Sequence, residues 1–474
     1  MHFATLAVMS AHRRRGCLAS FAPDKCARRA NVGKITPGAG GYIADLASRG
    51  RLSAPYASAR RALCFRRRGR RPGAVCQASV VLVLAIVCVV SAAAWLYLVA
   101  AHGGFWLTTQ RRPAGREPAV WPAVAAVVPA RNEADSLPET LPALLAQDYP
   151  GEFRVFLVDD NSDDGTGAIA AELGEKAARD GGVPLTVVTG KPRPDGWAGK
   201  VWAMTQGFAA VPGDGPLPEY VLFTDADISW APTALRDLVR GAEADDRALV
   251  SQMALLRAAT SWERVIVPAF VYFFAQLYPF RKVNDPKSGT AAAAGGCMLV
   301  RRAALEEAGG LERIKGALID DVALGTLLKR GGNRTWLGLT TDIRSARPYP
   351  SLASLWQMIA RSAYVQLRYN PLLLAGTIIG LLILYVAPPA GAVAALIAAA
   401  AGAGGGPVAV AGFAGLAGWA LMSASYVPML RLYRLSVLRA PSLPLIAALY
   451  AVMTADSARR HYSGRTVSWR GARA

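Results

Sequence analysis

The sequence predicts an α/β protein in which a domain built on a mostly parallel sheet is placed between membrane-spanning helices. Long apolar runs gather toward both ends of the 474 residues, and 53% of all residues are hydrophobic. Between those runs, short apolar stretches alternate with helical ones, which is typical of βαβ units. Acidic residues directly follow several of the predicted strands. We therefore expect a polar domain with an acidic site between two membrane regions.

The net charge and the positions of His and Cys limit which partners and which catalytic groups the protein can have. Lys and Arg outnumber Asp and Glu by 53 to 33, and much of the excess lies near the N-terminus and beside the apolar runs. This distribution favours a membrane surface over nucleic acid, so we expect no nucleic-acid partner. Of the four His and six Cys, only Cys297 is central. Zinc clusters, disulfide frameworks and His-dependent nucleophilic catalysis are excluded from the central region, because each needs a His or a second Cys.

Residues 1–77 are rich in Arg, Ala, Gly and Ser and show no sustained periodicity. We expect them to be a basic extension that is disordered or is not translated at all. No Met occurs between Met9 and Met204, so a shorter protein would begin at a Val codon near Val75 or Val80. An ordinary signal peptide is not expected, because the apolar core lies too far from the N-terminus.

Residues 79–101 form an uninterrupted apolar stretch that is long enough to span a bilayer. Trp95 and Tyr97 lie toward one end of it, as in an aromatic belt. The linker that follows carries Arg111, Arg112 and Arg116. By the positive-inside rule this linker indicates a cytoplasmic domain, whereas the Arg-rich extension indicates the opposite orientation.

Residues 121–350 are expected to form the central domain. Its strands are predicted at residues 123–128, 153–158, 185–188, 248–255 and 297–301, and in the apolar run that begins at Tyr220 and ends at Asp225 and Asp227. Its helices are predicted at residues 136–146, 166–178 and 303–309, and another is entered by the loop in residues 190–207. The apolar segment 262–280 contains Pro268 and is short for a bilayer span, so a helix packed on the domain or lying at the membrane interface is favoured.

Four carboxylates follow two of these strands, namely Asp159, Asp160, Asp225 and Asp227. A single Asp at a strand end is often only a helix cap or a turn residue. The carboxyl ends of parallel strands meet at one edge of the sheet, where ligands bind, so four acids together indicate a site. Asp225 and Asp227 suit Mg²⁺ or Mn²⁺ on a diphosphate, because such cations take one or two carboxylates plus phosphates. Lys200 is either a solvated residue or a counter-charge to that diphosphate.

A second acidic pair, Asp320 and Asp321, follows the apolar residues 317–319 and precedes a predicted helix. Two adjacent carboxylates at this place suit a general base held beside the electropositive start of a helix. Trp197 and Trp202 are more simply explained as packing residues than as platforms for a sugar.

The C-terminal third is expected to return to the membrane. Residues 351–369 carry apolar residues at helical spacing with Arg361 and Arg368 between them, which suits an interfacial amphipathic helix or a helix that covers the domain's core. Residues 372–457 are expected to hold two to three spans, at 372–401, at 407–430 and, if it is not re-entrant, at the shorter 443–454.

Five blocks carry a resemblance to a known family. In chain order they are VVPARNE, VDDNSDDGT, FTDADI, GGCMLVRR and LIDDVALG. They resemble the family 2 glycosyltransferases, which have the nucleotide-diphospho-sugar transferase fold called GT-A. The phrase GWAGKVWAMTQG, between membrane helices, is similar to the hopene-associated, membrane-bound branch of that family, which is related to ceramide glucosyltransferases. The resemblance covers residue 79 to the C-terminus.

The resemblance implies roles for individual residues. Donor binding would involve Pro129, Arg131, Glu133, Asp159, Asp160, Lys200 and Asp225. Asp225 and Asp227 would hold Mg²⁺ or Mn²⁺ on the donor diphosphate. Asp321 would be the general base for the acceptor hydroxyl, with Asp320 as the alternative. The interfacial acceptor side would involve Trp202, Arg368 and Tyr369.

The implied activity is an inverting, metal-dependent transfer of a sugar from a nucleotide-sugar, most simply a UDP-sugar, to a lipid hydroxyl, with a hopanoid as a candidate acceptor. The implied location is the bacterial inner membrane, with the domain in the cytoplasm. Processive polysaccharide synthesis is disfavoured because Arg368 precedes Tyr369, where such relatives carry Gln-x-x-Arg-Trp. A haloacid dehalogenase type phosphatase with Asp225 as nucleophile is disfavoured because that fold begins at its DxD strand. A non-enzymatic membrane scaffold is the remaining alternative.

Overall fold

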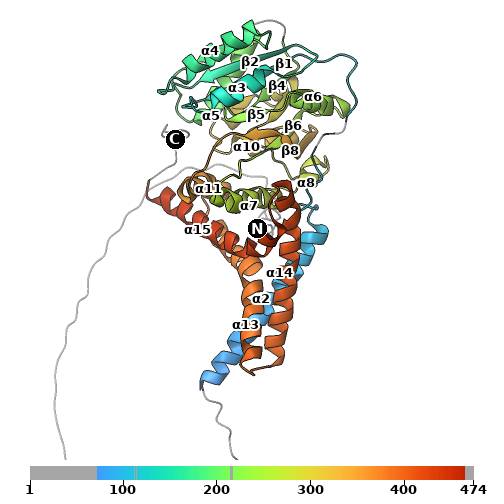
Figure 1. Cartoon of the computed structure of the whole chain (residues 1–474), viewed down its shortest axis with the longest axis vertical. Coiled ribbons are helices and arrows are strands. Elements are labelled where there is room, and N and C mark those ends of the chain that lie inside the picture. The colour runs from blue at the N-terminus through green and yellow to red at the C-terminus, as the bar shows by residue number, and fades with distance from the viewer. Residues whose placement is uncertain (1–71, 112, 114, 214–216, 465–474) are drawn as a thin grey trace, which may run out of the picture.

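The computed structural model describes residues 72–111, 113, 115–213 and 217–464. Most of the expected extension, residues 1–71, lies outside the described residues. Residues 72–77, which we had assigned to that extension, instead form the first turns of helix α2 (Pro72–Ala101). Figure 1 shows a head of strands and helices above a layer of crossing helices, from which a stalk of long helices extends.

The head contains an eight-stranded sheet in the order β3-β2-β1-β4-β7-β6-β8-β5. Its first half is parallel and is formed by β1 (Val124–Ala130), β2 (Phe153–Asp159), β3 (Leu185–Thr189) and β4 (Tyr220–Phe223). The connecting helices are α3 (Leu137–Leu145), α4 (Thr166–Arg179) and α5 (Gly199–Ala210). This half confirms the predicted strand and helix alternation.

Strand β1 explains why the parallel half is stable. All seven of its residues are buried. Val124 and Val128 pack on the cluster that includes α3, whereas Ala125 and Val127 pack on the opposite cluster, which includes α5. A strand covered on both faces is expected to be apolar without interruption, because successive side chains point to opposite faces.

The second half of the sheet is mixed. Strand β7 (Met298–Arg301) lies antiparallel between β4 and β6 (Leu249–Leu255). Strand β8 (Thr335–Ser345) runs parallel to β6, and β5 (Ile228–Trp230) pairs antiparallel with β8. We predicted neither β8 nor the short β5, which follows the turn that contains Asp225 and Asp227. The remaining helices of the head are α6 (Ala234–Ala244), α9 (Arg302–Glu307) and α10 (Asp320–Arg330).

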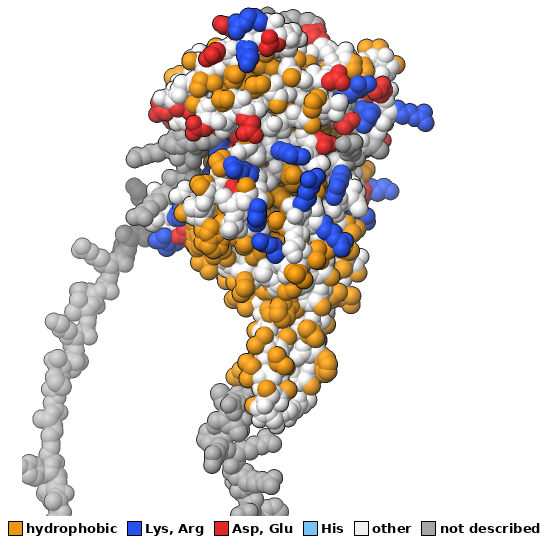
Figure 2. Space-filling view, in the orientation of Figure 1, with side chains coloured by type: hydrophobic (Ala, Val, Ile, Leu, Met, Phe, Trp, Pro, Cys, Tyr) orange, Lys and Arg blue, Asp and Glu red, His pale blue; other side chains and the backbone are white. Residues whose placement is uncertain are grey.

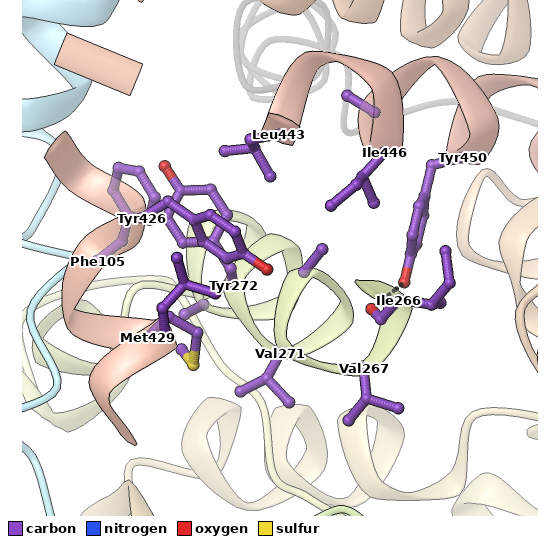
Figure 3. Close-up of a cluster of buried hydrophobic side chains, with 14 of the residues drawn as sticks. Phe105, Ile266, Val267, Val271, Tyr272, Tyr426, Met429, Leu443, Ile446 and Tyr450 are labelled. Carbon is purple, nitrogen blue, oxygen red and sulfur yellow. Dashed lines mark hydrogen bonds between the residues drawn. The ribbon is translucent and has the colours of Figure 1, made fainter. Parts of the chain in front are cut away.

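Beneath the head, α7 (Ser261–Leu277), α11 (Leu352–Gln366) and α15 (Leu443–Tyr462) form a layer that we call the platform, with the short α8 (Phe280–Asn284) beside it (Figure 1). Helix α7 begins with a capping box of Thr260 and Glu263. It packs into a buried cluster that includes Phe105, Tyr272, Tyr426 and Met429 (Figure 3). The segment predicted at 262–280 is therefore a packed helix, as expected.

Helix α15 is held to α11 by polar contacts as well as by packing. Trp356 Nε1 lies 2.8 Å from Asp456 Oδ2, and the backbone N–H of Tyr364 donates to Ser457 Oγ at 3.1 Å. Tyr450 reaches α7, where its hydroxyl donates to the Ile266 carbonyl at 3.3 Å (Figure 3). The helix extends well past the predicted 443–454, so the expectation of a short segment is wrong.

The stalk consists of α2, α13 (Ala387–Ala400) and α14 (Gly406–Leu432), and α12 (Pro371–Leu381) leads into α13 (Figure 1). Four segments of the described chain are long and apolar enough to cross a membrane: Ser79–Ala101, Pro371–Ala400, Gly406–Leu432 and Val437–Tyr462. In the most apolar part of the first three segments only 22%, 22% and 28% of the residues are buried. In the last segment 50% are buried, because this helix lies in the platform. Figure 2 shows hydrophobic side chains covering the stalk, with Lys and Arg gathered where it meets the head.

A π-helical turn, Leu382–Val386, joins α12 to α13. Such a turn displaces one residue from the helical hydrogen-bond pattern. The carbonyl of Leu384 accepts hydrogen bonds from α2, from Trp95 Nε1 at 2.7 Å and from Ser91 Oγ at 3.3 Å. A neighbouring helix thus satisfies a backbone group that an apolar surrounding would leave unpaired.

Candidate active site

The parallel strands bring the predicted acids to one edge of the sheet. In the register of β1 and β2, Ala130 lies opposite Asp159, and the backbone N–H of Asp160 donates to the Ala130 carbonyl at 2.8 Å. Strand β4 pairs with the other side of β1 and ends at Phe223, just before Asp225 and Asp227. The predicted convergence at the carboxyl ends of these strands is therefore observed.

Each member of the first acidic pair has its own cation. Lys200 Nζ lies 2.6 Å from Asp225 Oδ1, and Arg347 Nε lies 2.6 Å from Asp227 Oδ2. Burial raises the pKa of Asp225, and Lys200 opposes that shift. Lys200 sits in the first turn of α5, so the helix that follows the loop at 190–198 aims this cation at the strand edge.

Lys200 also joins the first acidic pair to the second. Its Nζ lies 3.0 Å from Asp320 Oδ2, at the start of α10. Burial of Lys200 lowers its pKa, but Asp225 and Asp320 outweigh that effect and the net shift is upward. The ammonium group therefore stays charged between two carboxylates, one in the turn after β4 and one at the start of α10.

Asp321 is held differently from its neighbour. It accepts hydrogen bonds from backbone N–H groups, from Gly295 to Oδ2 at 2.9 Å and from Val322 to Oδ1 at 2.7 Å. Burial, followed by the charge of Asp320, raises the pKa of Asp321 to about 7. A carboxyl group with this pKa changes its protonation state near neutral pH, as a general base does.

Gly295 leaves room for this arrangement. A Cβ at this position would lie 3.0 Å from Lys200 Nζ and 3.5 Å from Asp321 Oδ2. A side chain would therefore enter the space between the central cation and the second acidic pair. The Gly and Ala rich turn at residues 289–296 thus approaches the acids closely at Gly295, as a turn beside a ligand can.

Arg347 ties the first acidic pair to Glu133. Its Nη2 lies 3.0 Å from Glu133 Oε1, while its Nε contacts Asp227. Burial raises the pKa of Glu133 to about 8, more than Arg347 lowers it. We did not predict Arg347 as a site residue, because it follows β8, which we also missed. A strand predicted at residues 335–345 would have indicated Arg347, because this residue follows the end of that strand.

The other residues expected to bind the donor lie near the ends of β1 and β2. Arg131 Nη1 contacts both the carbonyl and Oδ2 of Asp160, at 2.7 and 3.2 Å. Burial raises the pKa of Asp160, and Arg131 opposes it. Asp159 Oδ1 accepts from the backbone N–H of Ser162 at 3.1 Å. Pro129 is a buried residue of β1, so its backbone and not a charged side chain would face the donor.

The three residues expected on the acceptor side do not join the acids. Trp202 Nε1 donates to the Lys191 carbonyl at 3.0 Å, and its ring meets that of Trp197 edge-on, which fits a packing role. Arg368 and Tyr369 end α11 with positive φ angles of 53° and 54°. Tyr369 stacks on His461 with ring centroids 4.3 Å apart. Within the described chain no ion pair or hydrogen bond links these residues to the carboxylates.

The donor set at the first pair fits a cation that arrives with a phosphate ligand. Among the described residues, no group of three or more His, Cys, Asp or Glu side chains is arranged to hold a metal ion. Asp225 and Asp227 by themselves supply the one or two carboxylates that Mg²⁺ or Mn²⁺ takes when phosphates and waters complete its shell. These residues therefore fit a substrate-associated cation and not a closed protein cage.

Part of the head is similar to known proteins. Residues 125–309 match the family Glycosyl transferase family 2, a match that ends before Asp320 and Asp321. A stretch of 141 residues is 33% identical to the probable glycosyltransferase YdaM of Bacillus subtilis (strain 168) and covers 29% of this chain and 31% of that protein. The chain thus spans about a third of the curated relative that it matches.

Two solved structures are also similar in part. The mannosyltransferase PcManGT of Pyrobaculum calidifontis, solved with GDP-Man and Mn²⁺, aligns with a TM-score of 0.49 and 21% identity over 80% of this chain and 99% of that one. TarS of S. aureus aligns with a TM-score of 0.33 and 18% identity, over 51% of this chain and 40% of that one.

Proposed function

We propose that the protein transfers a sugar from a nucleotide-diphospho-sugar to an acceptor hydroxyl, and the match of residues 125–309 to Glycosyl transferase family 2 supports this proposal. The observation that carries the proposal is Lys200, which bridges Asp225 and Asp320 at 2.6 and 3.0 Å. One cation thereby holds a pair of acids suited to the donor next to a pair suited to the acceptor. Transfer requires these two groups to meet at a single point.

The donor is assigned to the edge formed by β1, β2 and β4. Arg131, Asp160 and Asp159 are assigned to the nucleoside, and Asp225 with Asp227 to Mg²⁺ or Mn²⁺ on the diphosphate. The metal, when bound, would neutralise negative charge on the leaving diphosphate. Lys200 is positioned to stabilise the same developing charge, which is greater in the transition state than in the ground state. A UDP-sugar is the proposed donor.

Asp321 is the proposed general base. Its carboxylate is held by two backbone N–H groups and by no cation at ion-pair distance among the described residues, whereas Asp320 is committed to Lys200. A base must be free to take a proton, so the environments favour Asp321. Removal of the proton from the acceptor hydroxyl by Asp321 would accompany attack on the anomeric carbon from the face opposite the diphosphate, and the configuration would invert.

A lipid is the proposed acceptor, and the membrane is the proposed location. The support is the stalk with its apolar surface, together with the Lys and Arg side chains that gather between the head and the stalk on the face shown in Figure 2. Helix α10, which begins with Asp320 and Asp321, lies on the platform side of the head (Figure 1). A hydroxyl carried by a lipid would therefore reach Asp321 from below. The finer assignments, a hopanoid acceptor and the cytoplasmic face of a bacterial inner membrane, rest on residues 196–207 and on the cations of the linker.

The alternatives have less support. A phosphatase of the haloacid dehalogenase type would begin at the strand that carries Asp225, whereas here β1, β2 and β3 precede that strand. Processive synthesis has no added support from Tyr369, whose ring stacks on that of His461 in α15.

The test is to incubate membranes that contain the protein with a panel of labelled UDP- and GDP-sugars and to extract the lipids. We expect one labelled lipid that depends on a divalent cation. Release of free sugar or phosphate without any labelled lipid, for every donor, would contradict the proposal.

A further inference from the structure

Arg347 forms an ion pair with the carboxylate of Asp227, which the proposed divalent cation would need as a ligand. Its Nε lies 2.6 Å from Asp227 Oδ2, and its Nη2 lies 3.0 Å from Glu133 Oε1. The side chain of Asp227 is 12% exposed and that of Glu133 is 8% exposed, so water does not screen these contacts well. A guanidinium at this distance is a direct competitor of any metal ion for the same oxygen atom.

The two cations cannot both use that oxygen without strong repulsion. Mg²⁺ binds carboxylate oxygens at about 2.0–2.1 Å, closer than the guanidinium nitrogen stands from Asp227. A divalent ion at Oδ2 would therefore lie within a few ångströms of a full positive charge in a poorly hydrated site. One of the two must leave Asp227 when the other binds.

The backbone around Arg347 is fixed, so the side chain is the part that moves. The N–H of Ala346 donates to the Asp227 carbonyl at 2.8 Å. The N–H of Tyr349 donates to Glu263 Oε1 at 2.7 Å, and Glu263 is the fully buried cap of α7. With anchors on both sides, the guanidinium can change partners without the segment being displaced.

We propose that Arg347 is an internal counter-ion of the donor site, which holds Asp227 until a divalent cation and a diphosphate displace it and which then pairs with the diphosphate. Glu133 keeps the guanidinium close during the exchange. A planar guanidinium binds phosphate oxygens in bidentate fashion, so the same side chain serves both states. This inference rests on the proposed function, since it assumes a diphosphate donor at this edge.

The experiment measures binding of Mn²⁺ alone, by electron paramagnetic resonance, to the full chain purified in detergent. The variants are Arg347→Gln and the matched control Arg344→Gln, which removes the same charge from an exposed residue three positions earlier on β8. We expect Arg347→Gln to bind Mn²⁺ about tenfold more tightly than wild type, because a competitor is gone, and Arg344→Gln to match wild type. Binding of UDP or GDP at saturating Mn²⁺ should weaken only in Arg347→Gln.

Equal or weaker Mn²⁺ affinity in Arg347→Gln, or no binding by any of the three proteins, would overturn the inference. Matching melting temperatures of the three proteins exclude a folding defect as the cause. Labelled-lipid formation by wild type is scored separately. Failure of that assay rejects the proposed function, whereas failure of the Mn²⁺ comparison with lipid labelling intact rejects only the role of Arg347.

Discussion

The two acidic pairs look alike in the sequence but differ in the structure. Asp225 and Asp227 are separated by one residue, and each is matched to a basic side chain, Lys200 or Arg347. Asp320 and Asp321 are adjacent, and among the described residues only the first has a cation at ion-pair distance, while the second is held by backbone N–H groups. A carboxylate with a dedicated counter-ion suits charge binding, and one without suits proton transfer. The partners, more than the acids themselves, distinguish the donor side from the acceptor side.

The largest expected effect is at the acid without a cation. Asp321→Asn should lower kcat about 10²- to 10⁴-fold, because a general base contributes about that much. Nucleotide affinity, measured by calorimetry, should be unchanged. An equal loss of donor affinity would move Asp321 to the donor side and remove the contrast between the pairs.

The first pair should respond in the opposite way. Asp227→Asn is expected to weaken binding of the nucleotide with Mn²⁺ about 10- to 100-fold, because a hydrogen bond or ligand contact to a charged group contributes about 1.5–3 kcal/mol. The measurement is a titration with UDP or GDP in the presence of Mn²⁺. Unchanged affinity with reduced kcat would indicate that this acid, too, acts on chemistry.

The pH dependence sharpens the contrast further. Because burial raises the pKa of Asp321 to about 7, this carboxyl is protonated below pH 7 and ionised above it. A base works only when ionised, so kcat/KM should rise about tenfold per pH unit below pH 7 and level off above it. The rise should disappear in Asp321→Asn. A wild-type profile that is flat between pH 5.5 and 8 would argue against Asp321 as the base.

The smallest expected effect is at the glycine between the pairs. Gly295→Ala would bring a Cβ within 3.0 Å of Lys200 Nζ and shift the cation that both pairs share. We expect kcat to fall about tenfold, less than for Asp321→Asn, since displaced catalytic groups lose alignment. Gly289→Ala is the control in the same turn, where a Cβ meets nothing within 4 Å. Equal activity of the two variants would show that the space at Gly295 is not needed.

The sequence predicted the acids well and their partners poorly. Asp225 and Asp320 stand out because each follows an apolar run, a local pattern that needs no knowledge of the fold. Arg347 has no such pattern, since it meets Asp227 across 120 residues and Glu133 across 214. Long-range pairs of this kind depend on where a strand is inserted into the sheet.

The missed elements have a local cause. Strand β8 contains Gly338 and two adjacent threonines, which interrupt the apolar alternation, and β5 is only three residues long. Without β8 there was no reason to bring residues 346–350 to the site. Helix α15 was predicted too short because polar residues follow its apolar start, and the structure places those residues against α11.

The position of α15 in the platform has a consequence for the parity of the chain. In the proposed membrane arrangement α2, α13 and α14 run along the stalk, so the described part of the polypeptide crosses the membrane an odd number of times (Figure 1). The amino end of α2 and the carboxyl end of α15 then face different compartments. The Arg residues before α2 and those after it favour opposite ends of this helix as the cytoplasmic end. The Lys and Arg gathered below the head favour the end of α2 that leads into the head.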